Sequence, residues 1–429
     1  LGAGGDIGLG ILLLQRASSP RQRRAFAAVA LAGIGILVMT ALTSSLDTRK
    51  LTSGVYRTGR AALPEQAEVF YHRDGKTATV SLIDWAGRKT AILTNGKADA
   101  SLVMVPGEGP ARDEITMMMV AALALAQQPE ARLIANIGLG SGLTSHTLLA
   151  DDRLARVDSI EIEPLMIEAA RLGFGERVRN TYLDPRSHLV TEDAKSYFAN
   201  TGAIYDVIIS EPSNPWVSGV ASLFSREFYA IAKAHLRDGG ILLQWLQGYE
   251  TSPELIASVV AALSLHFEDY ALYSTGEADL VLVAKTGGRL APLDAALFRQ
   301  PRLAAELERV SLHGLQDFHI RALGNRAILE PLFASFGAPA NSDYHPFLDV
   351  HAEQARFLKA TLREIIHLGR LELPLLELLG AKPALRAPTR VSDYFDHGGA
   401  QLAVRAMGIR DEIAAGTPGP ILSVDRDYA

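Results

Sequence analysis

The sequence predicts an α/β protein, in which a doubly wound sheet follows a small antiparallel β domain and a transmembrane helix. Three observations carry this prediction. Apolar runs of strand length alternate with helical stretches between residues 131 and 246. Before them, apolar and polar residues alternate over 68–103, and the turns between these runs each hold a residue followed by glycine. Nearer the amino terminus, residues 25–44 form one uncharged apolar run.

The uncharged run is long enough to cross a bilayer. At 1.5 Å per residue it spans roughly 30 Å, the thickness of the hydrocarbon core. We therefore expect a transmembrane helix at about 25–44, with a buried core helix as the alternative. Residues 5–14 resemble the tail of an earlier membrane helix, so residues 1–45 are expected to end a membrane region and the chain to be the carboxyl-terminal part of a longer membrane protein.

The charges around this run leave its orientation open. Four arginines precede the run and four basic residues follow it, with the denser cluster before: Arg16, Arg21, Arg23 and Arg24, then Arg49, Lys50, Arg57 and Arg60. The positive-inside rule, taken literally, places the following domain outside the cytoplasm. A nucleotide made in the cytosol would argue for the cytoplasmic side, which is our expectation, at a bacterial inner membrane.

Composition excludes several kinds of site. The 429 residues contain no cysteine, so disulfides, thiolate zinc sites and cysteine nucleophiles are excluded. A net charge of -6 argues against general nucleic-acid binding. The histidines show no metal-ligand spacing, and we expect no metal.

Turn signals and periodicity divide the rest of the chain. Residues 50–110 are expected to form a small β-hairpin domain, with turns at Asp74-Gly75, Ala86-Gly87 and Asn95-Gly96, because type I′ turns need positive φ at both central residues. Residues 111–285 are expected to form the doubly wound domain. Residues 286–429 are expected to be helical over 290–336 and 355–379, with 343–350 adding a strand and short helices after 386.

Within the doubly wound domain, strands and helices alternate. The expected strands are 131–137, 157–162, 188–190, 206–210 and 240–246. The expected helices are 113–126, 143–150, 164–172 and 224–236. Buried parallel strands deliver polar groups to the carboxyl edge of such a sheet, where ligands bind.

A glycine loop follows the first of these strands. Gly138, Gly140 and Gly142 alternate with Leu139 and Ser141, which lets the backbone approach a ligand closely. The spacing departs from the dinucleotide fingerprint, and a plain tight turn is the alternative.

Two acids stand at the ends of the next strands. Glu161 is placed where a carboxylate can accept both ribose hydroxyls of a nucleotide, and Asp193, followed by Ala194, where an adenine amino group would lie. Either acid taken alone could be only a helix cap. Together with the loop, they predict a nucleotide site.

The order of these motifs resembles the spermidine synthase family of aminopropyltransferases over roughly residues 50–285. The segment 210–216, SEPSNPW, followed by LFSREFY at 223–229, resembles its membrane-fused bacterial branch, in which a major facilitator-like part precedes the synthase-like domain. The resemblance implies a class I methyltransferase-like fold and an S-adenosyl nucleotide, either decarboxylated S-adenosylmethionine or S-adenosylmethionine. It also implies a polyamine-like substrate and a homodimer.

The resemblance assigns roles at the end of the fourth strand. Where the family has Asp-x-x-Asp-Pro, this chain has Glu211 to Pro215, so Glu211 is expected to orient and deprotonate an amine. Asn214 can accept a hydrogen bond there but carries no charge. Ser141 replaces the aspartate that holds the donor's amino group, and Met117 replaces a substrate-side tyrosine.

Three further residues are expected near the substrate: Asp113, Trp216 and Gln244. Packing is the favoured explanation for Trp216, which stands beside a proline loop, and a structural role is an equally good explanation for Gln244. The departures at 141, 211 and 214 leave three functions open, namely aminopropyl transfer, methyl transfer from intact S-adenosylmethionine, and nucleotide or polyamine sensing without catalysis.

Overall fold

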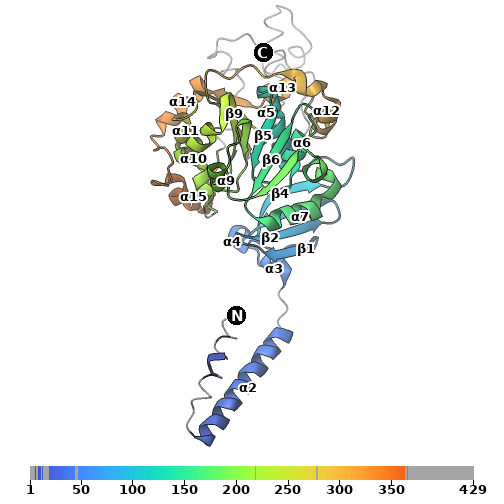
Figure 1. The fold of residues 1–429 in the computed structure, drawn as a ribbon, viewed down its shortest axis with the longest axis vertical. Helices are drawn as coiled ribbons and strands as arrows, with labels where there is room; N and C mark the ends of the chain where they lie inside the picture. The colour runs from blue at the N-terminus through green and yellow to red at the C-terminus, as the bar shows by residue number, and fades with distance from the viewer. Residues whose placement is uncertain are drawn as a thin grey trace, which may run out of the picture. The chain divides into compact units, whose positions relative to one another are not determined.

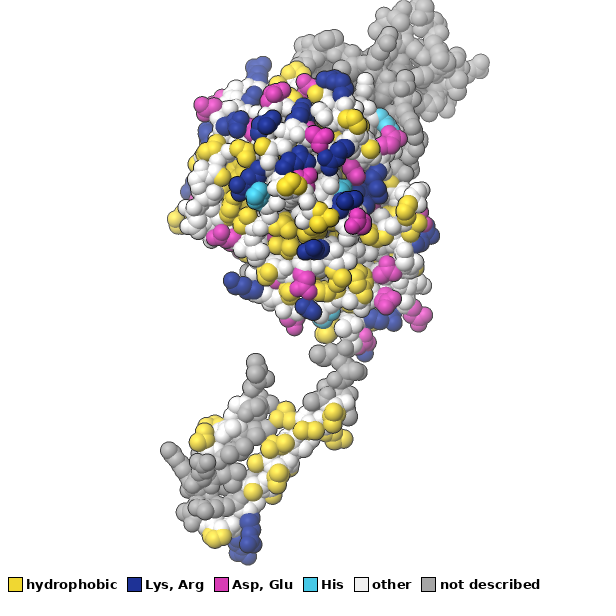
Figure 2. Space-filling view, turned by 45° about the vertical axis from the view of Figure 1, so that its right-hand side comes forward, with side chains coloured by type: hydrophobic (Ala, Val, Ile, Leu, Met, Phe, Trp, Pro, Cys, Tyr) yellow, Lys and Arg dark blue, Asp and Glu magenta, His cyan; other side chains and the backbone are white. Residues whose placement is uncertain are grey.

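The chain forms two separate units in the computed structural model, residues 1–63 and residues 64–429 (Figure 1). The structure describes residues 5, 8–10, 12, 19–43, 47–217, 219–276, 279–362 and 365. The first unit holds the long helix α2 (Pro20–Thr43) and the short helices α3 (Thr48–Leu51) and α4 (Val55–Thr58). In α2, Pro20–Thr40 is long and apolar enough to cross a membrane, and none of it is buried. Hydrophobic side chains cover its surface (Figure 2).

The second unit begins with a four-stranded antiparallel sheet in sequential order. Its strands are β1 (Ala67–Asp74), β2 (Thr79–Trp85), β3 (Lys89–Thr94) and β4 (Lys97–Val103). Ala86 and Gly87 have φ of 55° and 70°, and Asn95 and Gly96 have φ of 51° and 79°, so both central residues of these two turns adopt the expected positive φ.

The turn after Asp74 differs from the prediction. Gly75 is not among the residues with positive φ, and four residues separate the strands. Glu163 determines this loop, because its carboxylate accepts hydrogen bonds from Thr77 N at 2.7 Å and Thr77 Oγ1 at 2.8 Å. A side chain at Gly75 would collide with the same carboxylate.

The main sheet has eight strands in the order β12-β10-β11-β9-β8-β5-β6-β7. Their bounds are β5 (Leu133–Ile137), β6 (Arg156–Glu161), β7 (Ser187–Thr191), β8 (Tyr205–Ser210), β9 (Leu236–Gln247), β10 (Asp269–Ser274), β11 (Asp279–Lys285) and β12 (Ala322–Asn325). Strands β5 to β9 are parallel, whereas β11 is antiparallel to β9, β10 to β11 and β12 to β10. This is the predicted methyltransferase-like sheet, and its order reverses between β5 and β8, where a doubly wound fold binds its ligand.

Helices cover both faces of this sheet (Figure 1). The described helices of the second unit are α5 (Arg112–Gln127), α6 (Leu143–Leu148), α7 (Pro164–Phe174), α8 (Asn180–Leu183), α9 (Ala194–Asn200), α10 (Arg226–Ala234), α11 (Pro253–Ser264), α12 (Pro301–Glu308), α13 (Leu315–His319), α14 (Arg326–Ser335) and α15 (Phe347–Phe357), with 3-10 turns η1 (Gly175–Val178), η2 (Val220–Phe224) and η3 (Ala295–Arg299). Along β8, Val207 and Ile209 join one core and Ile208 joins the other. Burial of both faces explains the continuous apolar run of this strand.

Two predictions for the carboxyl-terminal part are wrong. The segment 343–350 adds no strand, because Phe347–Phe357 forms α15. The added strand is β12, inside the stretch predicted to be helical, and its Asn325 caps α14 by accepting a hydrogen bond from Ile328 N at 3.3 Å. Most of the predicted helix 355–379 and all of 386–429 lie outside the described residues.

The predicted helix 224–236 is also too long. Ser225 caps α10, accepting a hydrogen bond from Phe228 N at 3.2 Å, so the helix starts at Arg226. It ends at Ala234 because Leu236 already begins β9.

Candidate functional site

The glycine loop lies directly against the end of β8. Gly138 has φ of 88°, and a Cβ there would collide with the backbone oxygen of Glu211. Glu211 N donates to Ile137 O at 2.8 Å, which fixes the two strand ends side by side. Glycine at 138 is therefore required both by conformation and by the close approach of the neighbouring strand.

Glu161 holds the same loop from the other side. Its carboxylate accepts hydrogen bonds from Leu139 N at 3.0 Å and Glu163 N at 2.9 Å, and the residue is 8% exposed. Burial raises the pKa of Glu161. The acid thus orders the loop, and a carboxylate has further lone pairs for other donors.

Asp193 caps α9 in this structure. Its side chain accepts a hydrogen bond from Ser196 N at 2.9 Å, and Ala194 behind it is buried. Neither residue lines the pocket described next.

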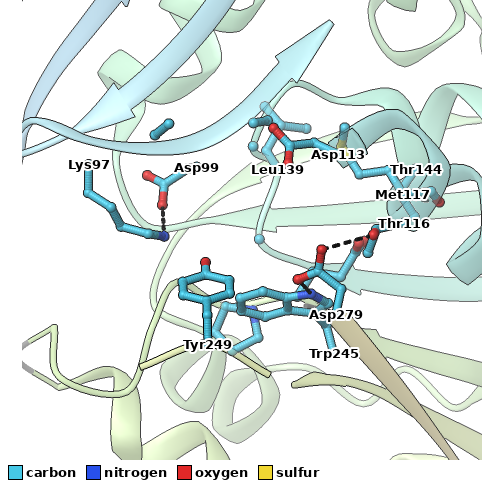
Figure 3. Close-up of a pocket in the computed structure, with 16 residues that line it drawn as sticks. Lys97, Asp99, Asp113, Thr116, Met117, Leu139, Thr144, Trp245, Tyr249 and Asp279 are labelled. Atoms are coloured by element: carbon cyan, nitrogen blue, oxygen red, sulfur yellow. Dashed lines mark hydrogen bonds and ion pairs between the residues drawn. The ribbon is translucent and has the colours of Figure 1, made fainter. Parts of the chain in front are cut away.

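A pocket of about 120 Å³ opens beside the glycine loop (Figure 3). It is bounded by β4, the start of α5, the loop after β5, the loop after β8, the end of β9 and the start of β11. Its lining residues are Lys97, Ala98, Asp99, Ala100, Asp113, Thr116, Met117, Gly138, Leu139, Gly140, Thr144, Glu211, Pro212, Trp245, Tyr249 and Asp279.

Glu211 lines this pocket. Burial raises the pKa of Glu211 to about 8, and a hydrogen bond with Thr144 only partly opposes that effect. A carboxyl with a pKa near neutrality can exchange a proton with a bound group at physiological pH.

Two further carboxyl groups line the pocket near α5. Asp279 accepts hydrogen bonds from Trp245 Nε1 at 3.1 Å and Thr116 Oγ1 at 3.2 Å. Burial, with the charge of Asp113 second, raises the pKa of Asp279 to about 6. Asp113 accepts a hydrogen bond from Ser101 Oγ at 2.7 Å, and burial raises its pKa as well.

A lysine on β4 supplies positive charge. Lys97 Nζ lies 2.7 Å from Asp99 Oδ1, and both side chains are largely buried. Ser213 Oγ donates to Asp99 Oδ1 at 3.0 Å, which ties β4 to the loop after β8. In Figure 3 this ion pair lies on one side of the pocket and Asp279 with Thr116 on the other.

Of the predicted site residues, Asp113, Gly138, Gly140 and Glu211 line the pocket, and eight do not: Ser141, Gly142, Glu161, Asp193, Ala194, Asn214, Trp216 and Gln244. Ser141 is fully buried, and its Oγ lies 3.1 Å from Met117 Sδ. Gln244 Nε2 donates to Ser210 O at 3.2 Å and to Trp245 O at 3.1 Å, so its amide joins two strand ends. Both residues therefore support neighbours of the pocket.

Asn214 and Trp216 lie in the loop after β8. Asn214 Nδ2 donates to the Tyr249 hydroxyl at 3.3 Å and to the side chain of Gln247. Asn214 is fully buried and reaches the pocket only through Tyr249. The Trp216 ring lies under the guanidinium of Arg356, at 5.8 Å.

Sequence reasoning missed Lys97, Asp99, Tyr249 and Asp279. For Lys97 and Asp99, the sequence showed only that both stand at the start of the strand after the Asn95-Gly96 turn. Charged residues at that place are expected to face solvent. Asp279 gave no signal, because an acid before a β-strand is ordinarily exposed. Among the described residues, no three His, Asp or Glu side chains are grouped as metal ligands.

Residues 114–276 match the family description of a spermine/spermidine synthase domain. The chain is 24% identical to a polyamine aminopropyltransferase of Aeropyrum pernix over 222 residues, which cover 50% of this chain and 67% of the relative. It is 30% identical to a polyamine aminopropyltransferase of Clostridium perfringens over 125 residues, 29% of this chain and 44% of the relative. It is 28% identical to polyamine aminopropyltransferase 2 of Pseudomonas aeruginosa over 130 residues, which cover 30% of this chain and 37% of the relative.

Solved structures with a similar fold include a spermidine synthase from Thermotoga maritima, with 20% identity, a TM-score of 0.44 and coverage of 54% of this chain and 77% of that one. A probable spermidine synthase from Corynebacterium glutamicum has 17% identity and a TM-score of 0.45, and the match covers 64% of this chain and 96% of that one. By sequence, residues 114–276 therefore resemble the spermine/spermidine synthase domain family, and this similarity supports a transferase.

Proposed function

We propose that this chain transfers an aminopropyl group from decarboxylated S-adenosylmethionine to a polyamine or a related amine, with Glu211 as the base that orients the amine. The observation that carries the proposal is that the glycine loop and Glu211 line one pocket together with three other acids: Asp99, Asp113 and Asp279. Within the described residues, Asp99 is the one of these three acids that forms an ion pair with a lysine, Lys97. A pocket with this charge favours a cationic substrate.

The reaction needs one proton acceptor. The nitrogen lone pair of the amine attacks the propyl carbon attached to the sulfonium, a carbon–nitrogen bond forms, and the carbon–sulfur bond breaks. Its electron pair returns to sulfur, which leaves methylthioadenosine as a neutral thioether. The amine loses a proton to the Glu211 carboxylate, whose pKa of about 8 is suited to that exchange near neutral pH.

The nucleotide would lie along the carboxyl edge of β5, β6 and β7. We assign Gly138, Gly140 and Gly142 to its close approach, Glu161 to the ribose hydroxyls, and Asp193 and Ala194 to the adenine end. The hydrogen bonds of Glu161 to the loop support this role, because an acid that orders the loop is already oriented when the nucleotide arrives. In this proposal Asn214 positions Tyr249 on the pocket wall.

Methyl transfer from intact S-adenosylmethionine is the second candidate. Lys97 favours it, because a buried ammonium on the pocket wall could neutralise the carboxylate that distinguishes the intact donor from the decarboxylated one. The ion pair with Asp99 would have to rearrange for that contact. The aminopropyl proposal needs no such rearrangement.

We also propose that α2 anchors the domain in a bacterial inner membrane, with the domain on the cytoplasmic side where its substrates are made. The length and apolar surface of α2 support an anchor. A major facilitator-like part before α2 and a homodimer are further expectations from the family resemblance. Protease accessibility in spheroplasts tests the side of the membrane, and light scattering of the detergent-solubilised chain tests dimer formation.

The test of the activity is calorimetric titration of the 429-residue chain in detergent with S-adenosylmethionine, its decarboxylated form and methylthioadenosine, each with and without putrescine. Preference for the decarboxylated donor, followed by release of methylthioadenosine, is the expected result. Preference for the intact donor would establish the second candidate instead. Binding without turnover would identify a sensing domain.

A further inference from the structure

The stretch that follows α2, residues 47–60 and here called the interface segment, combines positive charge with exposed apolar side chains. Leu51, Val55 and Tyr56 are 50%, 54% and 51% exposed. Large apolar side chains next to clustered basic residues are typical of a segment that lies at a membrane surface, where tyrosine is also enriched. Besides one acid, Asp47, the segment contains four basic residues: Arg49, Lys50, Arg57 and Arg60.

The interface segment is held in shape by its own hydrogen bonds. Asp47 caps α3 by accepting a hydrogen bond from Arg49 N at 3.0 Å. Ser53 Oγ donates to Lys50 O at 2.8 Å, and Arg49 Nη2 donates to Leu63 O at 2.7 Å. The apolar side chains are therefore presented to solvent by an ordered segment, and a ligand for them need not impose the order.

Chain length keeps this segment close to any bilayer that α2 crosses. Helix α2 ends at Thr43 and α3 begins at Thr48. Even when fully extended, the backbone between these two residues reaches at most about 18 Å. The headgroup layer is roughly 5–8 Å thick on each side of the hydrocarbon core, and charges act over about 8–10 Å at physiological salt. The start of α3 therefore stays within electrostatic range of the headgroups.

We propose that the interface segment binds anionic lipid headgroups through Lys50 and Arg60, while its exposed apolar side chains enter the bilayer surface. The inference rests on the proposed anchor α2 and concerns a surface outside the pocket. Lys50 and Arg60 are both exposed. The ion pair of Lys50 with Asp47, at 3.8 Å between exposed side chains, is weak enough to be exchanged for a lipid phosphate.

The test uses single fluorescent labels, which the absence of native cysteine allows. Val55→Cys reports on the interface segment, Val38→Cys on α2 and Leu265→Cys on the second unit, where Leu265 is 59% exposed. The 429-residue chain is reconstituted in nanodiscs of phosphatidylcholine, alone or with an equal amount of phosphatidylglycerol. Quenching by lipids that carry a nitroxide at the headgroup or in the acyl chain gives the depth of each label.

In nanodiscs with phosphatidylglycerol, the headgroup nitroxide should quench the Val55 label strongly and the Leu265 label weakly. Quenching at Val55 should be weaker in phosphatidylcholine alone and at high salt, because both conditions reduce the attraction of exposed cations to the surface. The acyl-chain nitroxide should quench the Val38 label in both lipids.

The charge contribution is measured with the double variant Lys50→Gln and Arg60→Gln in the Val55→Cys background. The ratio of docked to free label, read from fluorescence lifetimes, should fall at least about tenfold, since each basic residue near an anionic surface contributes roughly fivefold. The control is the double variant Lys233→Gln and Arg299→Gln, two exposed positions of the second unit, which should leave the ratio unchanged. Thermal unfolding establishes that each variant is folded.

Two results would overturn the lipid-binding inference alone, provided that the Val38 label is quenched. One is quenching at Val55 no stronger than at Leu265 in nanodiscs with phosphatidylglycerol, and the other is equal quenching at Val55 in both lipids. A Val38 label that the acyl-chain nitroxide does not reach would instead overturn the proposed anchor. If Val55→Cys does not fold, Leu51→Cys carries the label under the same criteria.

Discussion

Two walls of the same pocket are built in different ways. One wall consists of the loops after β5 and β8, where Gly138 and Glu211 lie side by side at the carboxyl ends of neighbouring parallel strands. The other comes from β4, α5 and β11, which carry Lys97, Asp113 and Asp279. The first wall follows from local motifs, and the second from packing of segments that are distant in the chain. The proposed base, Glu211, lies on the first wall, and the second wall carries the other charged side chains of the pocket.

The sharpest way to break this division is Glu211→Gln. The change removes the proton acceptor and keeps the side-chain shape, so kcat for aminopropyl transfer should fall by roughly 10²–10⁴-fold. Methylthioadenosine release measures the rate, and the affinity for methylthioadenosine should stay the same. Glu254→Gln, an exposed position on α11, is the control. An unaffected rate would remove Glu211 from the mechanism.

Gly138→Ala tests whether the first wall depends on the contact between its two strand ends. The new Cβ meets the Glu211 backbone at a residue with φ of 88°. The free energy of unfolding should fall by about 2–4 kcal/mol. Denaturant unfolding measures it, and Gly202→Ala serves as the control because a Cβ there meets nothing within 4 Å. Equal stabilities of the two variants would contradict the close approach.

Glu161→Ala tests the nucleotide end of the first wall. Loss of its charged hydrogen bonds should weaken the adenosyl ligand by about 1–3 kcal/mol. Calorimetric titration with methylthioadenosine measures the change, with Glu176→Ala as the control because Glu176 is 84% exposed. Unchanged affinity would show that the ribose site has been assigned to the wrong residue.

The pH dependence sharpens the assignment of the base. The pKa of Glu211 is raised from 4.5 to about 8, so the carboxylate needed as base forms only as pH rises through about 8. The value of kcat/KM should therefore rise roughly tenfold between pH 7 and pH 9 and then level off. Glu211→Gln should lack this limb of the profile. A wild-type profile already flat above pH 5 would mean that an acid with an ordinary pKa is the base.

The two departures from the family pattern at 141 and 117 meet in space. The Ser141 hydroxyl lies 3.1 Å from the Met117 sulfur, and Ser141 is closed off from the pocket. Where the family has an aspartate and a tyrosine, this chain thus has one buried contact. The contact between Ser141 and Met117 could not be predicted from the sequence, because the two residues are 24 positions apart and belong to different elements.

The sequence determined by itself what depends on local periodicity and turn chemistry. It predicted the apolar helix near the amino terminus, the small antiparallel sheet, the alternation of strands and helices, and the carboxyl-edge residues Gly138, Glu161 and Glu211. These follow because a strand that ends in glycine or an acid places that residue at a fixed edge of the sheet.

Only the tertiary structure decided the rest. It turned the late segment 347–357 into a helix and made the strand from 322–325, since edge pairing with β10 outweighs local propensity over four residues. It also placed Lys97 and Asp279 on the same pocket as the predicted residue Asp113, although their separation in the chain gives no sign of proximity. The physical reason is that contacts between distant segments depend on which apolar faces of helices and strands are buried against each other. Once those faces pack, the polar side chains next to them lie together at the site.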